Sequence, residues 1–235
     1  MILRRLGAAV LMAALTAPSA QADGPGAHFS PSPAHTVVVR LYQSRELVKA
    51  FALGEEVLED YRRKLGPGHP LVGSILNDLA MIRLAQKEAG EAERLLRDSL
   101  RIYERADGEN HPHVAMVLNN LGWLHESRER LREAEPFYRR AVAIFEKHPG
   151  EAGPEAAAAL ANLAGLRFAE RDYAEAVSLF RRSLAILQRQ PKPDAPAIAL
   201  ALENLAVVYA EMGDAQAAES ARAQLASLRK AASRR

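Results

Sequence analysis

The chain has 235 residues, of which 49% are apolar and 6% aromatic, so it can bury a substantial core and its composition favours helices over sheet. Its 31 lysines and arginines nearly balance 29 aspartates and glutamates, which gives no indication of a nucleic-acid-binding protein. It has no cysteine, which excludes disulfides, thiolate metal sites and a cysteine nucleophile.

The first 22 residues have the pattern of a secretory signal peptide. Arg4 and Arg5 form a basic start, residues 6–16 are an uncharged apolar run, and Ala20 and Ala22 provide the small residues of a cleavage site. We predict cleavage after Ala22 by the general secretion route, and hence a secreted or periplasmic protein. The alternative is an uncleaved membrane anchor, which the short apolar run disfavours because a span needs roughly 20 residues. Cleavage would leave 29 basic and 29 acidic residues.

Residues 23–35 are rich in glycine, proline and serine. This composition predicts a flexible leader before the folded part.

The remainder of the chain repeats with a period of 42 residues. The columns in register include Pro70, Pro112, Pro154 and Pro196; Leu76, Leu118, Leu160 and Leu202; Leu79, Leu121, Leu163 and Leu205; Ala80, Gly122, Ala164 and Ala206; and Ala92, Ala134, Ala176 and Ala218. Several columns in one register exclude coincidence. We predict a degenerate repeat over 36–68 and full repeats over 69–110, 111–152, 153–194 and 195–235, the last ending in a polar C-terminal cap.

Each repeat is predicted to form two helices joined by a turn. After Pro70, apolar residues follow helical spacing, and a proline at the first helical position presets φ without losing a needed N–H. The second helix of this repeat is expected from about residue 92 to 105. The residues before the four prolines are poor N-caps: His69, His111, Gly153 and Ala195.

These columns resemble the tetratricopeptide repeat (TPR), and the 42-residue period with His69-Pro70 and His111-Pro112 resembles its kinesin-light-chain type. Residues 117–122 (VLNNLG) are similar to the first helix of that repeat, and residues 133–141 (EAEPFYRRA) to the second. The resemblance covers about residues 36–230. It implies an all-α, right-handed superhelical solenoid of antiparallel helical hairpins, whose first helices line a concave protein-binding groove.

We found no motif of an enzyme. The chain lacks a phosphate-binding loop and a nucleophile elbow, and His125-Glu126 lacks the second histidine of a zinc-protease helix. The histidines of His111-Pro112-His113 could bind a metal, but no third ligand is apparent, so a surface or capping role is favoured. We therefore expect neither catalytic activity nor a cofactor.

The implied groove suggests a peptide-binding site. Asp78, Asn120, Asn162 and Asn204 recur at the 42-residue step, and in resembling proteins asparagines here bind a peptide backbone through the amide donor and acceptor. The alternative is that they tie neighbouring helices together. The residues predicted to bind peptide are Asp78, Met81, Asn119, Asn120, Trp123, Asn162, Phe168 and Asn204. Trp123, the only tryptophan, is either an anchor for the partner or part of the core.

These features predict an exported scaffold that binds an extended segment of another protein. The alternative is a structural, self-assembling envelope protein that stacks through its ends as a homo-oligomer. We expect no nucleic-acid partner, and membrane association only if the signal is uncleaved.

Overall fold

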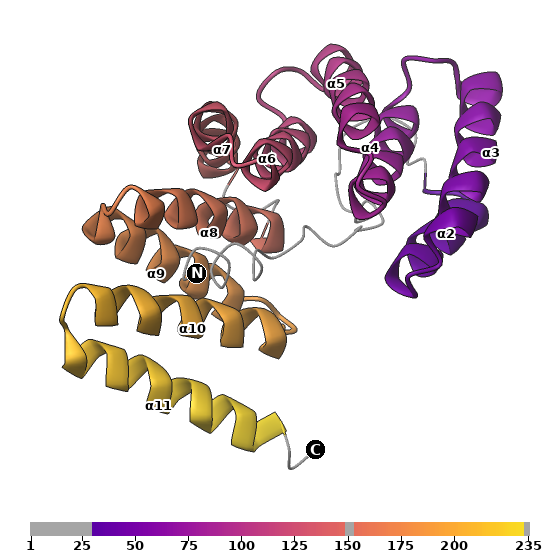
Figure 1. Cartoon of the computed structure of the whole chain (residues 1–235). Coiled ribbons are helices and arrows are strands. Elements are labelled where there is room, and N and C mark those ends of the chain that lie inside the picture. Colours follow the sequence, from indigo (N-terminus) through magenta and orange to yellow (C-terminus); the bar gives the residue numbers. More distant parts are fainter. Residues whose placement is uncertain (1–29, 149–152, 233–235) are drawn as a thin grey trace. The chain divides into compact units, whose positions relative to one another are not determined.

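The computed structural model describes residues 30–148 and 153–232, and these residues form ten helices and no strand (Figure 1). The predicted signal peptide and the leader up to residue 29 lie outside the described residues. Within the described ranges, no helix combines the length and apolar character required to cross a membrane. The all-α class expected from the repeats is confirmed.

The helices form five successive pairs, each with a first helix (A) and a second helix (B). The pairs are α2 (Pro33–Gln43) with α3 (Leu47–Leu65), α4 (Pro70–Ala85) with α5 (Ala89–Ala106), α6 (Pro112–Ser127) with α7 (Leu131–Lys147), α8 (Gly153–Ala169) with α9 (Tyr173–Gln188), and α10 (Ala195–Glu211) with α11 (Ala215–Ala232). The chain divides near the end of α7 into two compact units. One holds described residues 30–144, and the other holds described residues 145–148 and 153–232 and is called the unit of residues 145–232. Each unit is described by itself below.

The turn from helix A to helix B has the same geometry in every pair. One residue has a positive φ of 61–79° at each 42-residue step, namely Arg45, Lys87, Glu129, Arg171 and Gly213. The next N–H donates to a carbonyl five residues back, as Glu88 does to Arg83 at 2.8 Å. This is a Schellman C-cap. Because α2 ends in the same way, the degenerate first repeat is a complete helical pair.

The starts of the A helices differ from expectation in two respects. His69 and His111 are effective caps, since each Nδ1 accepts the N–H two residues later at 3.1 and 3.2 Å. Helix α10 is capped by Asp194, one residue before the expected position, through the N–H of Ala197. A histidine ring nitrogen can therefore replace the usual hydroxyl or carboxylate oxygen.

The folded part begins earlier than the predicted end of the leader. Helix α2 starts at Pro33, with the Ser32 hydroxyl accepting from the N–H of His35 at 3.2 Å. His35 is only 1% exposed. The flexible leader expected up to residue 35 is therefore incorrect for residues 33–35, because they form the first turn of α2 and the buried imidazole of His35 anchors that turn.

Small residues let neighbouring helices approach closely, both within a pair and between successive pairs. A Cβ placed on Gly122 of α6 would lie 2.6 Å from the ring of Tyr138 on α7. A Cβ on Gly54 of α3 would lie equally close, at 2.6 Å, to Leu79 of α4. The column of Ala80, Ala164 and Ala206 is likewise buried. The repeat columns are therefore packing positions, as the sequence predicts.

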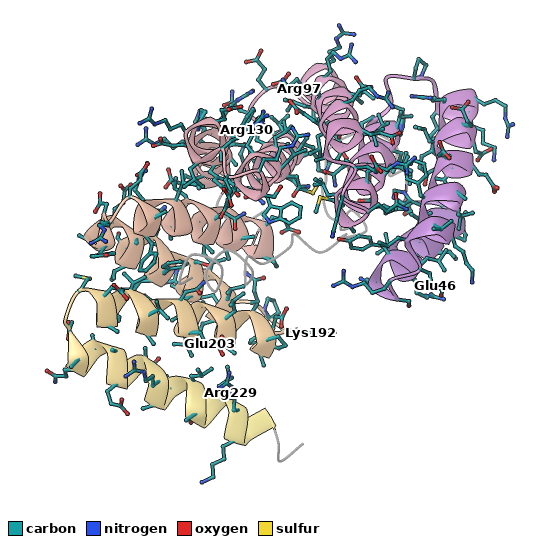
Figure 2. The ribbon with its side chains drawn as sticks, in the orientation of Figure 1. Glu46, Arg97, Arg130, Lys192, Glu203 and Arg229 are labelled. Atoms are coloured by element: carbon teal, nitrogen blue, oxygen red, sulfur yellow. The ribbon has the colours of Figure 1, made fainter. Side chains whose placement is uncertain are left out.

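The last pair of helices is also joined at its surface. Arg229 of α11 extends to the carboxylate of Glu203 on α10 and binds it (Figure 2). Both residues are exposed, so this contact adds little to stability. The exposed residues of α11 include Gln216, Glu219, Arg222 and Gln224, as expected for a polar terminal cap.

Candidate functional site

In the unit of residues 30–144, the predicted site begins with a buried acid on α4. Asp78 is 2% exposed, and its Oδ2 lies 2.7 Å from Nε2 of His35 on α2. The other ring nitrogen of His35 lies 3.3 Å from the hydroxyl of Tyr61 on α3. Burial raises the pKa of Asp78, and the hydrogen bond and charge of His35 offset part of this rise. Asp78, through His35 and Tyr61, therefore links helices α4, α2 and α3.

The next member of the column forms a similar tie. The Nδ2 of Asn120 on α6 donates to Oδ1 of Asn77 on α4 at 2.8 Å. Both side chains are buried, at 2% and 5% exposure. Asn77 was not among the predicted site residues, although it stands one position before the column. This carboxamide pair links the A helices of two adjacent repeats.

The remaining predicted residues of this unit lie on the same helices. Met81 is 2% and Asn119 is 4% exposed, whereas Trp123 is half-buried, one helical turn beyond Asn119 and Asn120. Trp123 is therefore the large apolar side chain of this group that retains partial exposure. Its partial exposure is compatible with an anchoring role for a partner.

A second carboxylate lies near Trp123 on α6. Glu126 accepts a 2.6 Å hydrogen bond from the hydroxyl of Tyr138 on α7. Burial raises the pKa of Glu126, and the Tyr138 hydrogen bond lowers it by a smaller amount. The pKa of the Tyr138 phenol is also raised, first by burial and then by the nearby carboxylate.

In the unit of residues 145–232, Asn162 on α8 is 1% exposed and Asn204 on α10 is 8% exposed. Phe168, near the end of α8, is 7% exposed, and its ring centroid lies 5.5 Å from that of Tyr173. In this unit, therefore, the two asparagines keep their repeat positions, and Phe168 packs at the turn between α8 and α9.

The expected exposed face is thus not what the structure shows for this column. Helix α4 packs against both α3 and α5, and α10 packs against both α9 and α11. The side chains of Asp78 and Asn204 are therefore buried rather than exposed. Asp78 and Asn120 tie helices together, which is the alternative that the sequence left open. Binding of a peptide by the column stays a prediction.

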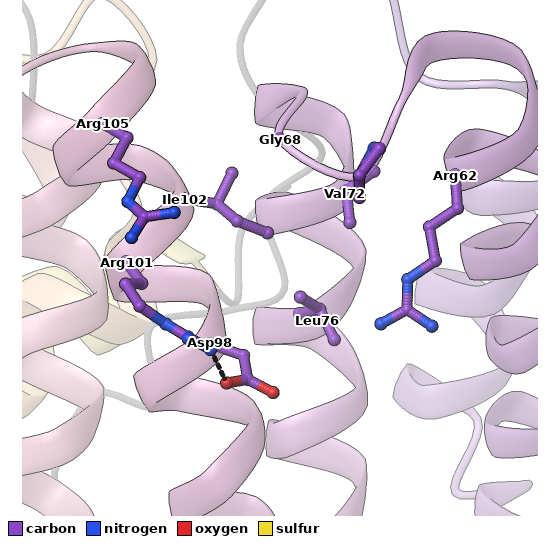
Figure 3. A pocket seen from close by; sticks show the side chains of 9 residues that line it. Arg62, Gly68, Val72, Leu76, Asp98, Arg101, Ile102 and Arg105 are labelled. Atoms are coloured by element: carbon purple, nitrogen blue, oxygen red, sulfur yellow. Dashed lines mark hydrogen bonds and ion pairs between the residues drawn. The ribbon is translucent and has the colours of Figure 1, made fainter.

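The described part of the chain also contains a pocket of about 410 Å³ between α3, α4 and α5 (Figure 3). Val72, Leu76 and Ile102 form its apolar floor, and three arginines surround it. The lining residues are Arg62, Pro67, Gly68, Val72, Leu76, Asp98, Arg101, Ile102 and Arg105. Asp98 binds Arg101 at one edge (Figure 3).

The pocket was not predicted from the sequence because its lining comes from three helices and a link. The only sequence signal is the helical spacing of Asp98, Arg101, Ile102 and Arg105 on α5, which also fits an ordinary solvated face. Chemically, guanidinium groups above an apolar floor suit a carboxylate on a short apolar chain.

Comparison with known families identifies the repeats. A family model described as "Tetratricopeptide repeat" matches residues 40–105, 73–147 and 155–231, which is most of the chain. The chain belongs to the tetratricopeptide repeat family. TPR repeats generally mediate protein–protein interactions, and this fold is typically a non-catalytic scaffold.

Solved structures agree with this fold. The chain is similar to BtubC (BKLC) from P. vanneervenii, with 25% identity and a TM-score of 0.73 over 85% of this chain and 80% of that one. It is similar to nearly identical TPR-like repeats of a putative kinesin light chain from Podosopora anserina, with 23% identity, a TM-score of 0.67 and coverage of 86% and 95%. The Cut9 and Hcn1 complex of APC/C matches at 16% identity and a TM-score of 0.64, over 83% of this chain and 32% of that one.

These matches confirm the helical-repeat solenoid class and the likeness to kinesin-light-chain repeats. A comparison with curated proteins gives no match. The partner and the location of this TPR protein are therefore argued from its residues alone.

Proposed function

We propose that this TPR protein is an exported scaffold that binds an extended segment of a partner protein along its A helices. The observation that carries the proposal is the recurrence of a carboxamide or carboxylate at one position of α4, α6, α8 and α10: Asp78, Asn120, Asn162 and Asn204. A carboxamide can donate to a peptide C=O and accept from a peptide N–H at once.

The pair of Asn77 and Asn120 limits how much an asparagine of this column can contribute to binding. Their 2.8 Å hydrogen bond holds one amide of α6 in a defined orientation. A peptide that replaced this contact would exchange one hydrogen bond for another, so Asn120 would contribute less than the roughly 0.5–1.5 kcal/mol of a newly formed hydrogen bond.

Hydrogen bonds alone do not give useful affinity. A micromolar complex requires about 8 kcal/mol, so apolar contacts must supply most of the binding free energy. Trp123 is the favoured anchor because it is large and half-buried on the same helix as Asn120. Glu126 on α6 and the exposed Glu211 at the end of α10 favour a partner segment that carries lysine or arginine.

The export part of the proposal rests on the pattern of residues 1–22. The test is to express the full chain with its own N-terminus and to analyse the envelope and cytoplasmic fractions by mass spectrometry. A mature protein that starts at Asp23 supports export with cleavage. An intact N-terminus in the cytoplasm would reject it.

The binding part is tested by affinity capture from an envelope extract. The parent is compared with a Trp123→Ala variant and with the triple variant Asn120→Ala, Asn162→Ala and Asn204→Ala. Val48→Ser is the matched control, because Val48 is an apolar side chain on helix B α3 and is 78% exposed. Circular dichroism establishes that each variant is folded.

Binding along the A helices is supported if a partner is captured by the parent and the control but not by Trp123→Ala or by the triple asparagine variant. Retention by every variant would reject this surface. Light scattering over a range of concentrations distinguishes the alternative: a mass that rises with concentration, without a captured partner, would favour self-assembly.

A further inference from the structure

Three side chains able to bind a metal ion come together in the link between α5 and α6. One carboxylate oxygen of Asp107 and one ring nitrogen each of His111 and His113 lie within 4.8 Å of one another. From the sequence alone the two histidines have no third ligand. The structure supplies it, because Asp107 is the C-cap of α5 and the short link folds back beside the first turn of α6.

The distances suit a small divalent ion. Nδ1 of His113 lies 2.8 Å and Nδ1 of His111 lies 3.7 Å from Oδ2 of Asp107. Ligands about 2.0–2.1 Å from a tetrahedral zinc ion are about 3.3 Å from each other. The two observed distances lie on either side of that value, and all three ligand atoms lie within 4.8 Å of one another. Side-chain rotations that move the ligand atoms by up to about 1.5 Å would therefore bring the three atoms around one ion.

The histidine rings are already held together in this link. The ring centroids of His111 and His113 are 4.4 Å apart, and the ring of His113 lies 4.8 Å from that of Tyr103 on α5. The side chains of Asp107, His111 and His113 are 18%, 25% and 33% exposed, so an ion can reach them from solvent. A preorganised, accessible set of ligands loses little conformational entropy when it binds.

The preceding link shows that helix capping does not require this cluster. There His69 caps α4 as His111 caps α6, through an Nδ1 that accepts a backbone N–H at 3.1 Å. The positions equivalent to Asp107 and His113 are Leu65 and Leu71, which cannot bind a metal. Asp107 and His113 are therefore additions to a link whose capping is complete without them.

We propose that Asp107, His111 and His113 form a binding site for a first-row divalent cation of the Zn²⁺ type. Two imidazoles and one carboxylate are ligands that such ions prefer, and a solvent molecule completes the coordination. The ion would join the C-terminal end of α5 to the N-terminal end of α6, and thus stiffen the junction between two repeats. If Nδ1 of His111 binds the ion, it gives up its 3.2 Å contact with the N–H of His113.

The test uses the full chain, without a polyhistidine tag, after treatment with a chelator. Zn²⁺ alone is titrated by isothermal calorimetry, and thermal unfolding is recorded with and without it. The variants are Asp107→Asn, which keeps an oxygen to accept a hydrogen bond from His113, and His113→Asn. The matched control is His148→Asn, a histidine after the end of α7.

We expect one Zn²⁺ per chain, a rise in melting temperature with Zn²⁺, and an affinity at least about tenfold weaker in each of the two site variants, because loss of even an outer-shell group costs about 10–100-fold. The control should bind as the parent does. Absence of stoichiometric binding by the parent, or equal affinity in the parent and both folded site variants, would overturn the proposal.

Discussion

The carboxylate of Glu133 lies 3.2 Å from Nδ1 of His125, joining the end of α6 to the first turn of α7. The equivalent contacts in other hairpins pair an arginine with a glutamate, Arg83 with Glu91 and Arg167 with Glu175, each at 2.7 Å. The basic residues at 83, 125 and 167 and the glutamates at 91, 133 and 175 each recur with the 42-residue step. In three of the five hairpins, therefore, a basic side chain near the end of helix A lies beside a glutamate at the start of helix B.

Removal of the two glutamates that bind Arg167 should destabilise the protein more than removal of Arg167 itself. Arg167 is 4% exposed, while Glu170 and Glu175, which bind it, are 46% and 44% exposed. The double variant Glu170→Gln, Glu175→Gln should lose about 1–3 kcal/mol of unfolding free energy, because it removes two carboxylates from a buried cation. Arg167→Met should change it by less than about 1 kcal/mol, since the carboxylates can be hydrated. Urea unfolding measures both, and a larger loss for Arg167→Met would contradict this account.

Asp78 should make stability depend on pH. Burial raises the pKa of Asp78 in the folded state above its unfolded value of about 3.9. The folded protein therefore binds more protons than the unfolded chain between these two values, and this contribution to stability is lost as pH rises through the folded pKa. Asp78→Asn, which places here the residue found at 120, 162 and 204, removes the effect.

Urea midpoints of the parent and Asp78→Asn from pH 4 to 8 test this prediction. As pH rises, the unfolding free energy of Asp78→Asn should increase relative to that of the parent, by at most about 1.4 kcal/mol per pH unit. Glu93→Gln is a control that should show little change over this range, because a hydrogen bond from Arg97 lowers the pKa of Glu93 and its contribution is lost only as pH falls below the ordinary value of 4.5. A difference between parent and Asp78→Asn that is independent of pH would show that the buried acid does not contribute in this way.

Gly122 should not tolerate a methyl group, although alanine occupies its column in the other full repeats. The added Cβ would lie 2.6 Å from the ring of Tyr138, whose hydroxyl is held by Glu126. We expect Gly122→Ala to lower the unfolding free energy by about 1–3 kcal/mol despite the better helix propensity of alanine. Gly165→Ala, with no atom within 4 Å of the new Cβ, should raise it by up to about 1 kcal/mol. Thermal unfolding measures the stability of both variants. If both substitutions stabilise or both destabilise the protein, the packing explanation is rejected.

The hairpin turns offer a second glycine comparison. Lys87 has a φ of 69° where the last hairpin has Gly213 with a φ of 79°. Lys87→Gly should relieve about 1 kcal/mol of backbone strain, partly offset by the greater entropy of the unfolded chain. Gly213→Ala should cost about 1 kcal/mol. Chemical unfolding measures the change in unfolding free energy for each variant. Destabilisation by Lys87→Gly would mean that contacts of the lysine side chain outweigh the backbone strain.

Much of the fold could be predicted because a repeat constrains every copy at once. The proline column marks the starts of α4 and α6, and the leucine and alanine columns mark their buried faces. The caps were harder to predict. Histidine is an unusual N-cap, and Lys87 gives no sign of a positive φ, so Gly213 is the only residue of the turn column whose type suggests it.

The candidate site was predicted only in part. The positions of Asn120 and Asp78 on their helices follow from the helical period, but their partners Asn77 and His35 do not, because these belong to other repeats. Contacts between residues about 43 positions apart depend on how one hairpin packs on the next. That packing is a property of side-chain shape rather than of local sequence.

By itself, the sequence determined that this protein is a helical repeat of the tetratricopeptide kind, since local periodicity and turn chemistry act within each 42-residue unit. Only the tertiary structure decided which polar groups meet. It placed Asp107 beside His113, buried Asp78 against His35, and opened a pocket between α3 and α5. The physical reason is that burial and distance are set by the close packing of separate helices, and a one-dimensional pattern does not contain these quantities.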